Sequence, residues 1–206
     1  MMRKELPLRK VSAEHILQVY RDGHRHQIVS DPEAEPDIVL DINSTVADWR
    51  DACDLRRWRA LGRALNEEWG IAASDSEWKA VLQPSRKRKL LDVCQFIAER
   101  APLPQLEKRG SLGAVCMAAG AFVGICAALR KEGIDTARIR PSTELAPYVR
   151  ANPHPFVFFA AVVAPGRLPV ARFESRFWIL SRFMSFGTLK TFGDYARCLT
   201  GEITAV

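Results

Sequence analysis

The sequence predicts a mainly α-helical (α+β) fold with a minor β component, arranged as one globular helical domain around a buried central helix. Residues 111–129 carry no charged side chain, and no other segment is as long or as apolar. Elsewhere, apolar residues recur every three or four positions, which is the spacing of one face of an α-helix. Runs typical of β-strands occur near residues 37–42 and 156–178. Together these observations place the chain in the mainly helical class.

The length and composition are those of a globular protein. The chain has 206 residues, of which 48% are hydrophobic and 26% charged, so it can bury a substantial core. The prediction is therefore a single helical domain over residues 1–206, with a subdivision into 1–101 and 102–206 as the alternative. The N-terminal sequence is charged and lacks the apolar run of a signal peptide, which favours a cytoplasmic location.

The cysteines and histidines predict no metal site. The five cysteines are odd in number, form no CxxC pair and mostly lie among apolar residues. They are therefore expected to be reduced and buried in a cytoplasmic protein. The four histidines are not spaced to join them around zinc, so the sequence predicts neither a metal nor a cofactor.

The central helix is predicted over residues 111–132, and two environments compete for it. A stretch this long without charge is a candidate membrane span, and Gly120 and Gly124 form a GxxxG pattern that permits close helix contact. However, nine of the nineteen residues from 111 to 129 are alanine or glycine, which weakens insertion into lipid. The sequence therefore favours a core helix with a neighbouring helix against the glycines, and no stable membrane insertion.

Helix caps and apolar spacing place several helices in the first half of the chain. Ser12 is expected to cap the first helix, and Ser74 a short helix that Pro84 ends. Between them, two helices joined near residues 54–57 are predicted, the second ending at Gly70. The tryptophans on these helices are expected in the core.

A motif around residue 41 carries one functional hypothesis. The apolar run at residues 38–40 is followed by Asp41, Asn43 and Thr45 in a DxNxT arrangement. This pattern resembles the first motif of the haloacid-dehalogenase-like phosphotransferases, in which an aspartate at the end of a strand is the nucleophile and binds magnesium. The resemblance departs at Asn43, where the family has a second aspartate that acts as acid and base in its phosphatases. It implies a magnesium-assisted phosphate-ester hydrolase centred on Asp41, with Asn43 and Thr45 in supporting roles.

The same motif has a purely structural explanation. Thr45 can cap a helix, and Asp48 three residues later completes an acidic variant of a capping box. The family's later motifs are matched only by residues 140–143, Lys190 and Asp194, and the alternating strands and helices of such a fold are not evident.

A second hypothesis rests on the basic run Arg86, Lys87, Arg88 and Lys89. If Ser85 caps the following helix, these cations occupy its first turn, where the helix dipole disfavours them. A bound anion reverses this effect, because free amides and cations then converge on it. The run is therefore a candidate anion-binding segment, and a solvated cluster of charges is the alternative.

The C-terminal part contains an apolar run followed by a basic and aromatic segment. Residues 156–164 end at a Pro-Gly turn and predict a buried strand, with a short buried helix as the alternative. The segment beyond can stack on bases and hold phosphates or rest on an anionic membrane. It is also typical of an element whose aromatics are buried and whose arginines face water. The candidate anion-binding residues here are Arg172, Arg176 and Arg182.

These features together predict a non-catalytic binding or interaction protein. The net charge of +6 favours anionic partners. No nucleotide-binding loop, coherent catalytic set or internal repeat is recognisable in the sequence. The expected partner is another protein or an anionic macromolecule such as nucleic acid, and the hydrolase centred on Asp41 is the alternative.

Overall fold

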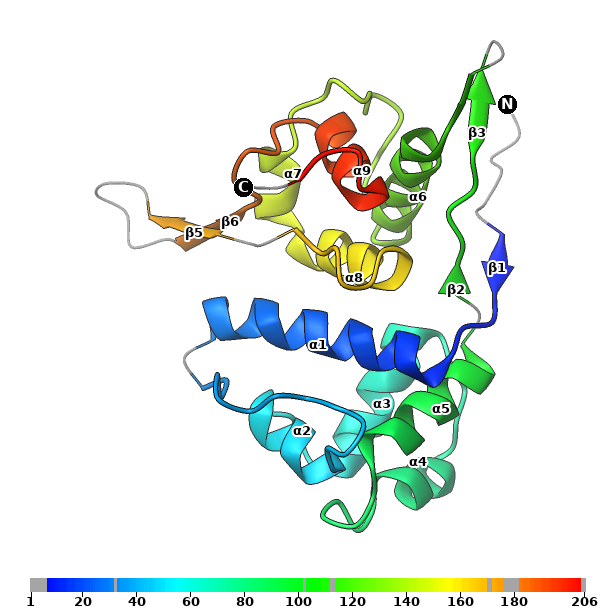
Figure 1. The fold of residues 1–206 in the computed structure, drawn as a ribbon, viewed down its shortest axis with the longest axis vertical. Coiled ribbons are helices and arrows are strands. Elements are labelled where there is room, and N and C mark those ends of the chain that lie inside the picture. Colours follow the sequence, from blue (N-terminus) through cyan, green and yellow to red (C-terminus); the bar gives the residue numbers. More distant parts are fainter. Residues whose placement is uncertain are drawn as a thin grey trace. The chain divides into compact units, whose positions relative to one another are not determined.

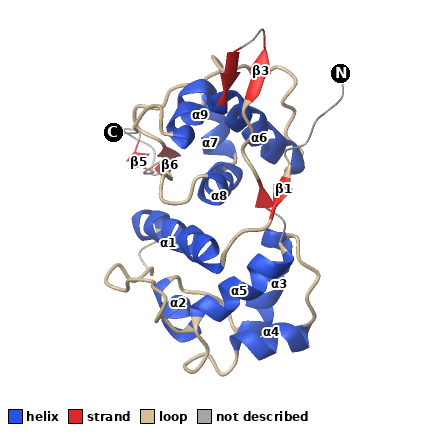
Figure 2. Cartoon of the chain, turned by 45° about the vertical axis from the view of Figure 1, so that its right-hand side comes forward, coloured by secondary structure: helices blue, strands red, loops and turns tan. Residues whose placement is uncertain are grey.

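The computed structural model describes residues 7–31, 33–101, 103–111, 114–169, 172–175 and 182–204. Helices dominate the described chain, and its short strands pair in two-stranded sheets (Figure 2). The predicted mainly helical fold with a minor β component is therefore confirmed. The chain divides into two compact units. The N-terminal unit holds residues 9–103, and the C-terminal unit holds residues 104–206 with the segment that precedes Arg9.

The N-terminal unit is built from helices joined by loops of varied length (Figure 1). Its helices are α1 (Ala13–Ser30), α2 (Val46–Ala52), α3 (Trp58–Trp69), α4 (Asp75–Leu82) and α5 (Leu90–Arg100). Two short strands, β1 (Leu8–Arg9) and β2 (Leu103–Pro104), pair at the points where the chain passes from one unit to the other.

Three helices of this unit begin at the caps that the sequence predicts. Ser12 accepts a hydrogen bond from the first turn of α1. Thr45 and Ser74 form capping boxes with Asp48 and Glu77 at the starts of α2 and α4. Each cap satisfies amide groups that the first turn of a helix leaves without an acceptor. These three start points are confirmed.

The core of the N-terminal unit forms where α1 packs along α5. Leu17 of α1 and Val93 and Ile97 of α5 are almost completely buried. Trp78 is also buried, and its indole Nε1 donates a hydrogen bond of 2.9 Å to Asn66 Oδ1. This bond satisfies the one polar atom of the indole, as burial of a tryptophan requires.

The C-terminal unit combines helices with two β-hairpins (Figure 1). In chain order its elements are β3 (Arg109–Ser111), β4 (Ala114–Cys116), α6 (Met117–Lys131), α7 (Ala146–Ala151), α8 (Pro153–Val163), β5 (Arg172–Ser175), β6 (Arg182–Ser185) and α9 (Phe192–Thr200). Helix α6 packs against α8 and α9. The aromatic centre of this core is Phe156, Phe192 and Tyr195, with Tyr195 Oη donating to the Phe156 carbonyl oxygen at 2.6 Å.

The central helix is shorter than predicted. It begins at Met117 and not at residue 111, because Arg109–Ser111 pairs with Ala114–Cys116 in an antiparallel hairpin. The close neighbour of Gly120 is also not a helix. A Cβ added at Gly120 would lie 2.0 Å from the carbonyl oxygen of Glu107, which belongs to the non-helical segment before the hairpin. Because Gly120 has no side chain, the backbone at Glu107 can pack directly against α6.

Residues 156–163 belong to helix α8, with Ala164 at its C-cap, so the buried helix given as the alternative is observed and not the predicted strand. Pro153 and Pro155 stand in its first turn, where a missing N–H removes no hydrogen bond. Phe156 and Phe159, three residues apart, are both buried, which fits a helix face and not the alternation of a strand. Every residue of the run is apolar, so the spacing of apolar residues could not distinguish a helix from a strand there.

The predicted strand at residues 37–42 is likewise wrong. These residues form a turn-rich loop, in which the Leu40 carbonyl oxygen accepts a hydrogen bond of 2.6 Å from Arg21 Nε. In the second predicted β region, residues 156–178, the described strand is β5.

Within the part of the chain that the structure describes, no helix combines the length and the apolarity that crossing a bilayer would require.

Candidate functional site

The structure brings the two sequence-predicted sites of the N-terminal unit together. The loop before α2 pairs with the loop before α5 through an antiparallel bridge between Thr45 and Lys89. Val46 N donates to the Arg88 carbonyl oxygen, and Leu90 N donates to the Ser44 carbonyl oxygen, each at 2.9 Å. The two loops therefore pair at one point, just before their helices begin. We call this bridge and its two backbone hydrogen bonds the crossing of the loops.

The cationic side chains follow from this crossing. We call residues 86–89 the basic loop. Its backbone turns at Pro84, whose carbonyl oxygen accepts from Lys87 N at 2.9 Å and from Arg88 N at 3.1 Å. Arg88 Nε donates to the Gln83 carbonyl oxygen at 3.0 Å, and Lys89 Nζ donates to the Asn43 carbonyl oxygen at 2.6 Å. Main-chain acceptors thus hold both the loop and two of its cations.

The charge of the basic loop is not neutralised within the described residues. All four of its side chains are exposed, and none of them forms an ion pair with a described acidic residue. Two neighbouring aspartates serve as helix caps: Asp48 accepts from Thr45 N at 2.7 Å, and Asp92 accepts from Lys89 N at 3.4 Å. The loop therefore presents four adjacent positive charges to solvent.

The helix dipole contributes less here than the sequence suggested. Helix α5 begins at Leu90 with Lys89 at its N-cap, so Ser85 is not the cap and the cations precede the first turn. Ser44 and Lys89 carbonyl oxygens already accept from the amides of Leu90 and Asp92. Attraction for an anion would consequently come from the side chains of the loop and not from the start of the helix.

The Asp41 carboxylate is used to build the loop before α2. Its Oδ1 accepts hydrogen bonds from Asn43 N at 2.7 Å, from Ser44 N at 2.9 Å and from Ser44 Oγ at 3.3 Å. The bond from Asn43 N, helped by those from Ser44, holds the pKa of Asp41 below its ordinary value against a partial loss of solvation. Thr45 Oγ1 accepts from Asp48 N at 3.1 Å as the cap of α2.

The structure places Asp41 differently from the family motif that suggested a hydrolase. A nucleophilic aspartate of that kind stands at the end of a strand, and residues 37–42 form no strand. Asp41, Asn43 and Thr45 instead shape a turn and a cap that position the basic loop. Among the described residues, no group of three or more His, Cys, Asp or Glu side chains is arranged to hold a metal ion.

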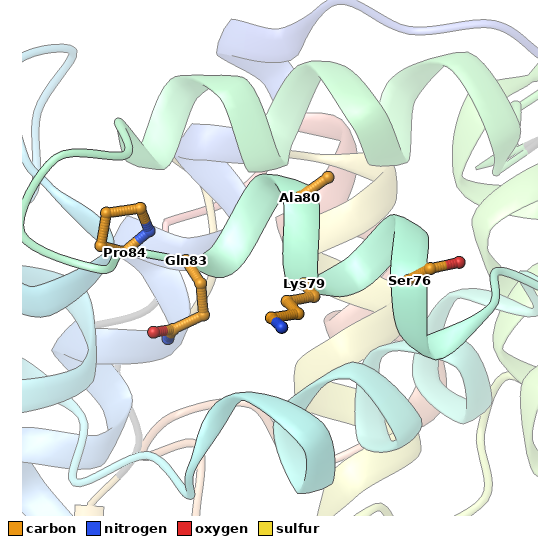
Figure 3. Close-up of a pocket in the computed structure, with 5 residues that line it drawn as sticks. All are labelled: Ser76, Lys79, Ala80, Gln83 and Pro84. Carbon is orange, nitrogen blue, oxygen red and sulfur yellow. The ribbon is translucent and has the colours of Figure 1, made fainter.

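A shallow surface depression adjoins the basic loop. It has a volume of about 510 Å³ and runs along α4 to the turn that starts the loop. Its lining residues are Ser76, Lys79, Ala80, Gln83 and Pro84 (Figure 3). Lys79 lies in α4 and Gln83 is its C-cap residue, and their side chains project to the same side (Figure 3). The depression therefore carries one exposed lysine, Lys79.

The C-terminal candidates lie in or beside the hairpin of β5 and β6. Arg172 and Arg182 begin β5 and β6, where their backbones pair with Ser185 and Ser175. Arg176 lies outside the described residues. Of the aromatics in this region, Phe186 and Phe192 are buried in the core of the C-terminal unit.

Sequence reasoning missed the crossing of the two loops. Residues 44–46 and 88–90 are far apart in the chain, and their contact uses backbone atoms that carry no side-chain signature. No family model matches the chain, and neither a curated protein nor a solved structure is detectably similar to it.

Proposed function

We propose that this protein is a non-catalytic binding protein that holds nucleic acid through the phosphate contacts of its basic loop. The observation that carries the proposal is that four exposed, adjacent cations stand on a backbone held by hydrogen bonds to Pro84 and to the loop before α2. Cations held in place before binding lose less conformational entropy when a polyanion arrives.

Phosphate recognition suits this surface better than recognition of bases. Phosphates are bound by Arg and Lys charges, whereas base recognition requires stacking aromatics or side chains that reach base edges. The aromatic residues nearest in sequence, Trp78 and Phe96, are buried, and their ring centroids lie 4.8 Å apart with the ring planes tilted by 57°. The proposed binding is therefore independent of nucleotide sequence.

The test is a titration of a labelled DNA duplex of about 30 base pairs at about 50 and 200 mM salt. The variant reverses two charges, Arg86→Glu with Lys87→Glu, because neither side chain is among those that tether the loop. The logarithm of affinity falls with the logarithm of salt by about 0.9 for each phosphate contact, so the slope of the variant should be shallower by about 2.

A matched control variant separates this site from net charge. Arg56 and Arg57 are also adjacent, exposed cations of the N-terminal unit, and they form no ion pair with a described residue. Arg56→Glu with Arg57→Glu gives the same change in charge and should leave the salt slope close to that of the unaltered protein. Equal binding by the two variants would show that the basic loop is not the site.

A further inference from the structure

The two units of the chain contain the same turn before their second helices. In the N-terminal unit, Asp41 N donates to Ser44 Oγ at 2.8 Å, and Ser44 N donates back to the Asp41 carbonyl oxygen. In the C-terminal unit, Arg140 N donates to Thr143 Oγ1 at 2.8 Å, and Thr143 N donates back to the Arg140 carbonyl oxygen. A buried aliphatic residue precedes each turn.

The crossing of two loops also occurs twice. An antiparallel bridge joins Glu144 to Thr191, as one joins Thr45 to Lys89 in the N-terminal unit. Leu145 N donates to the Lys190 carbonyl oxygen at 2.9 Å. Phe192 N donates to the Thr143 carbonyl oxygen at 3.1 Å. These bonds reproduce the pair that crosses the loops beside the basic loop, and they place Lys190 at the position of Arg88.

The helices around the two crossings also correspond: α1 and α5 in the N-terminal unit match α6 and α9 in the C-terminal unit. Helix α1 packs along α5, and α6 packs along α9 (Figure 1). Asp92 and Asp194 stand at the same position in the first turns of α5 and α9 and accept a bond from the N-cap amide. Four buried positions correspond: Leu90, Val93, Cys94 and Ile97 in α5 to Phe192, Tyr195, Ala196 and Leu199 in α9. The chain therefore repeats one structural plan.

The second copy of the crossing also carries exposed cations. Arg138, Arg140 and Lys190 are exposed and form no ion pair with a described residue; we call these three the second corner. As at the basic loop, main-chain carbonyl oxygens hold two of these cations. Arg140 Nη1 donates to the Ala137 carbonyl oxygen at 3.1 Å, and Lys190 Nζ donates to that of Gly187 at 3.3 Å.

The cations at and beside the second corner outnumber the acids by one: Arg138, Arg140, Lys190 and Arg197 against Asp135, Glu144 and Asp194. Asp135 accepts a hydrogen bond from Ala137 N at 2.9 Å. Glu144 lies at the bridge itself. Asp194 is committed to Arg197 at 2.6 Å and to the cap of α9. The second corner thus keeps an excess of positive charge, although it is smaller than that of the basic loop.

From this correspondence we infer that the second corner is a second anion-binding site, which takes phosphate groups of nucleic acid as the basic loop does, but more weakly. The inference rests on the proposed function of the basic loop, because it transfers that chemistry to an equivalent place in the C-terminal unit. A chain with two such sites would bind a long polyanion more tightly than either site alone, provided that both can engage it.

The experiment counts binding sites on the full chain with a DNA duplex of about 10 base pairs at about 50 mM salt. Calorimetric titration should give two duplexes per chain for the unaltered protein. Arg140→Glu with Lys190→Glu should reduce this to one, and Arg86→Glu with Lys87→Glu should also leave one. Lys108→Glu with Lys131→Glu reverses two other exposed cations of the C-terminal unit and should leave two.

A charge-retaining variant guards against an effect on folding. Arg140→Lys with Lys190→Arg should keep two sites, and a loss of one site in this variant would overturn the inference, because charge would not be its cause. One duplex per chain that only the basic-loop variant abolishes would also overturn the second site while leaving the proposed function intact. Binding that only the second-corner variant abolishes would refute the proposed function and support the second site. No binding by the unaltered protein refutes both.

Discussion

Replacement of Gly120 by alanine tests the packing of the central helix. A Cβ at this position would lie 2.0 Å from the Glu107 carbonyl oxygen and 3.1 Å from its carbonyl carbon. The loop carrying Glu107 must therefore move by roughly 1 Å or more to restore an ordinary van der Waals separation. Such overpacking costs about 1–3 kcal/mol, and replacing glycine inside a helix returns about 0.5–1 kcal/mol. The expected net loss is about 1–2 kcal/mol.

The measurement is thermal unfolding followed by circular dichroism. For a chain of this length the loss corresponds to a decrease in Tm of about 2–8 °C. Gly23→Ala is the control, because Gly23 lies inside α1 and a Cβ there would meet nothing within 4 Å. Alanine loses less backbone entropy than glycine on folding, so the Tm of this variant should rise by about 1–4 °C. If Gly120→Ala proves as stable as Gly23→Ala, the close approach of the loop to α6 is not real.

Three further changes probe caps, buried polar groups and titration. Asn66→Ala leaves the buried indole N–H of Trp78 without its acceptor and should cost about 1–3 kcal/mol in denaturant unfolding, whereas an unchanged midpoint would contradict that bond. Thr45→Ala removes the cap of α2 and should cost about 1 kcal/mol, with Thr45→Ser retaining most of the stability. Burial raises the pKa of Tyr195 well above its ordinary value, so the neutral phenol is favoured in the folded state. Stability from this group is complete below the ordinary tyrosine pKa and declines as pH rises above it. Because Tyr195 stays neutral near pH 10, ultraviolet titration should show the same number of ionising tyrosines in the unaltered protein and in Tyr195→Phe until unfolding begins.

Features fixed by neighbouring residues were predictable from the sequence. Ser12, Thr45 and Ser74 cap their helices as expected, because a cap depends on side chains within one turn. Gly70 ends α3 in the left-handed conformation that glycine adopts readily. The cationic character of residues 86–89 was equally plain, since charge runs of this kind are usually exposed.

Features that depend on distant residues were not predictable. The residues just before α6 were expected in the helix because they are uncharged and mostly apolar. They form strands instead, because pairing in the hairpin satisfies their backbone groups. The run at residues 156–164 is apolar throughout, so its period could not separate helix from strand. The loop crossings depend on backbone bonds between remote segments, and the two copies share few identical residues. The repeated plan is therefore visible in three dimensions and not in the sequence.

The crossing at the basic loop ties the proposed binding of a polyanion to folding of the N-terminal unit. The loop keeps its shape through bonds from Val46 and Ala47 at the start of α2, so unfolding that separates α2 from α5 also disperses the four cations. A polyanion that needs this arrangement binds the folded chain in preference to the unfolded one. By mass action, ligand at about one hundred times its Kd would then stabilise the fold by about 2.7 kcal/mol. The protein's resistance to denaturation would thus vary with the concentration of its partner.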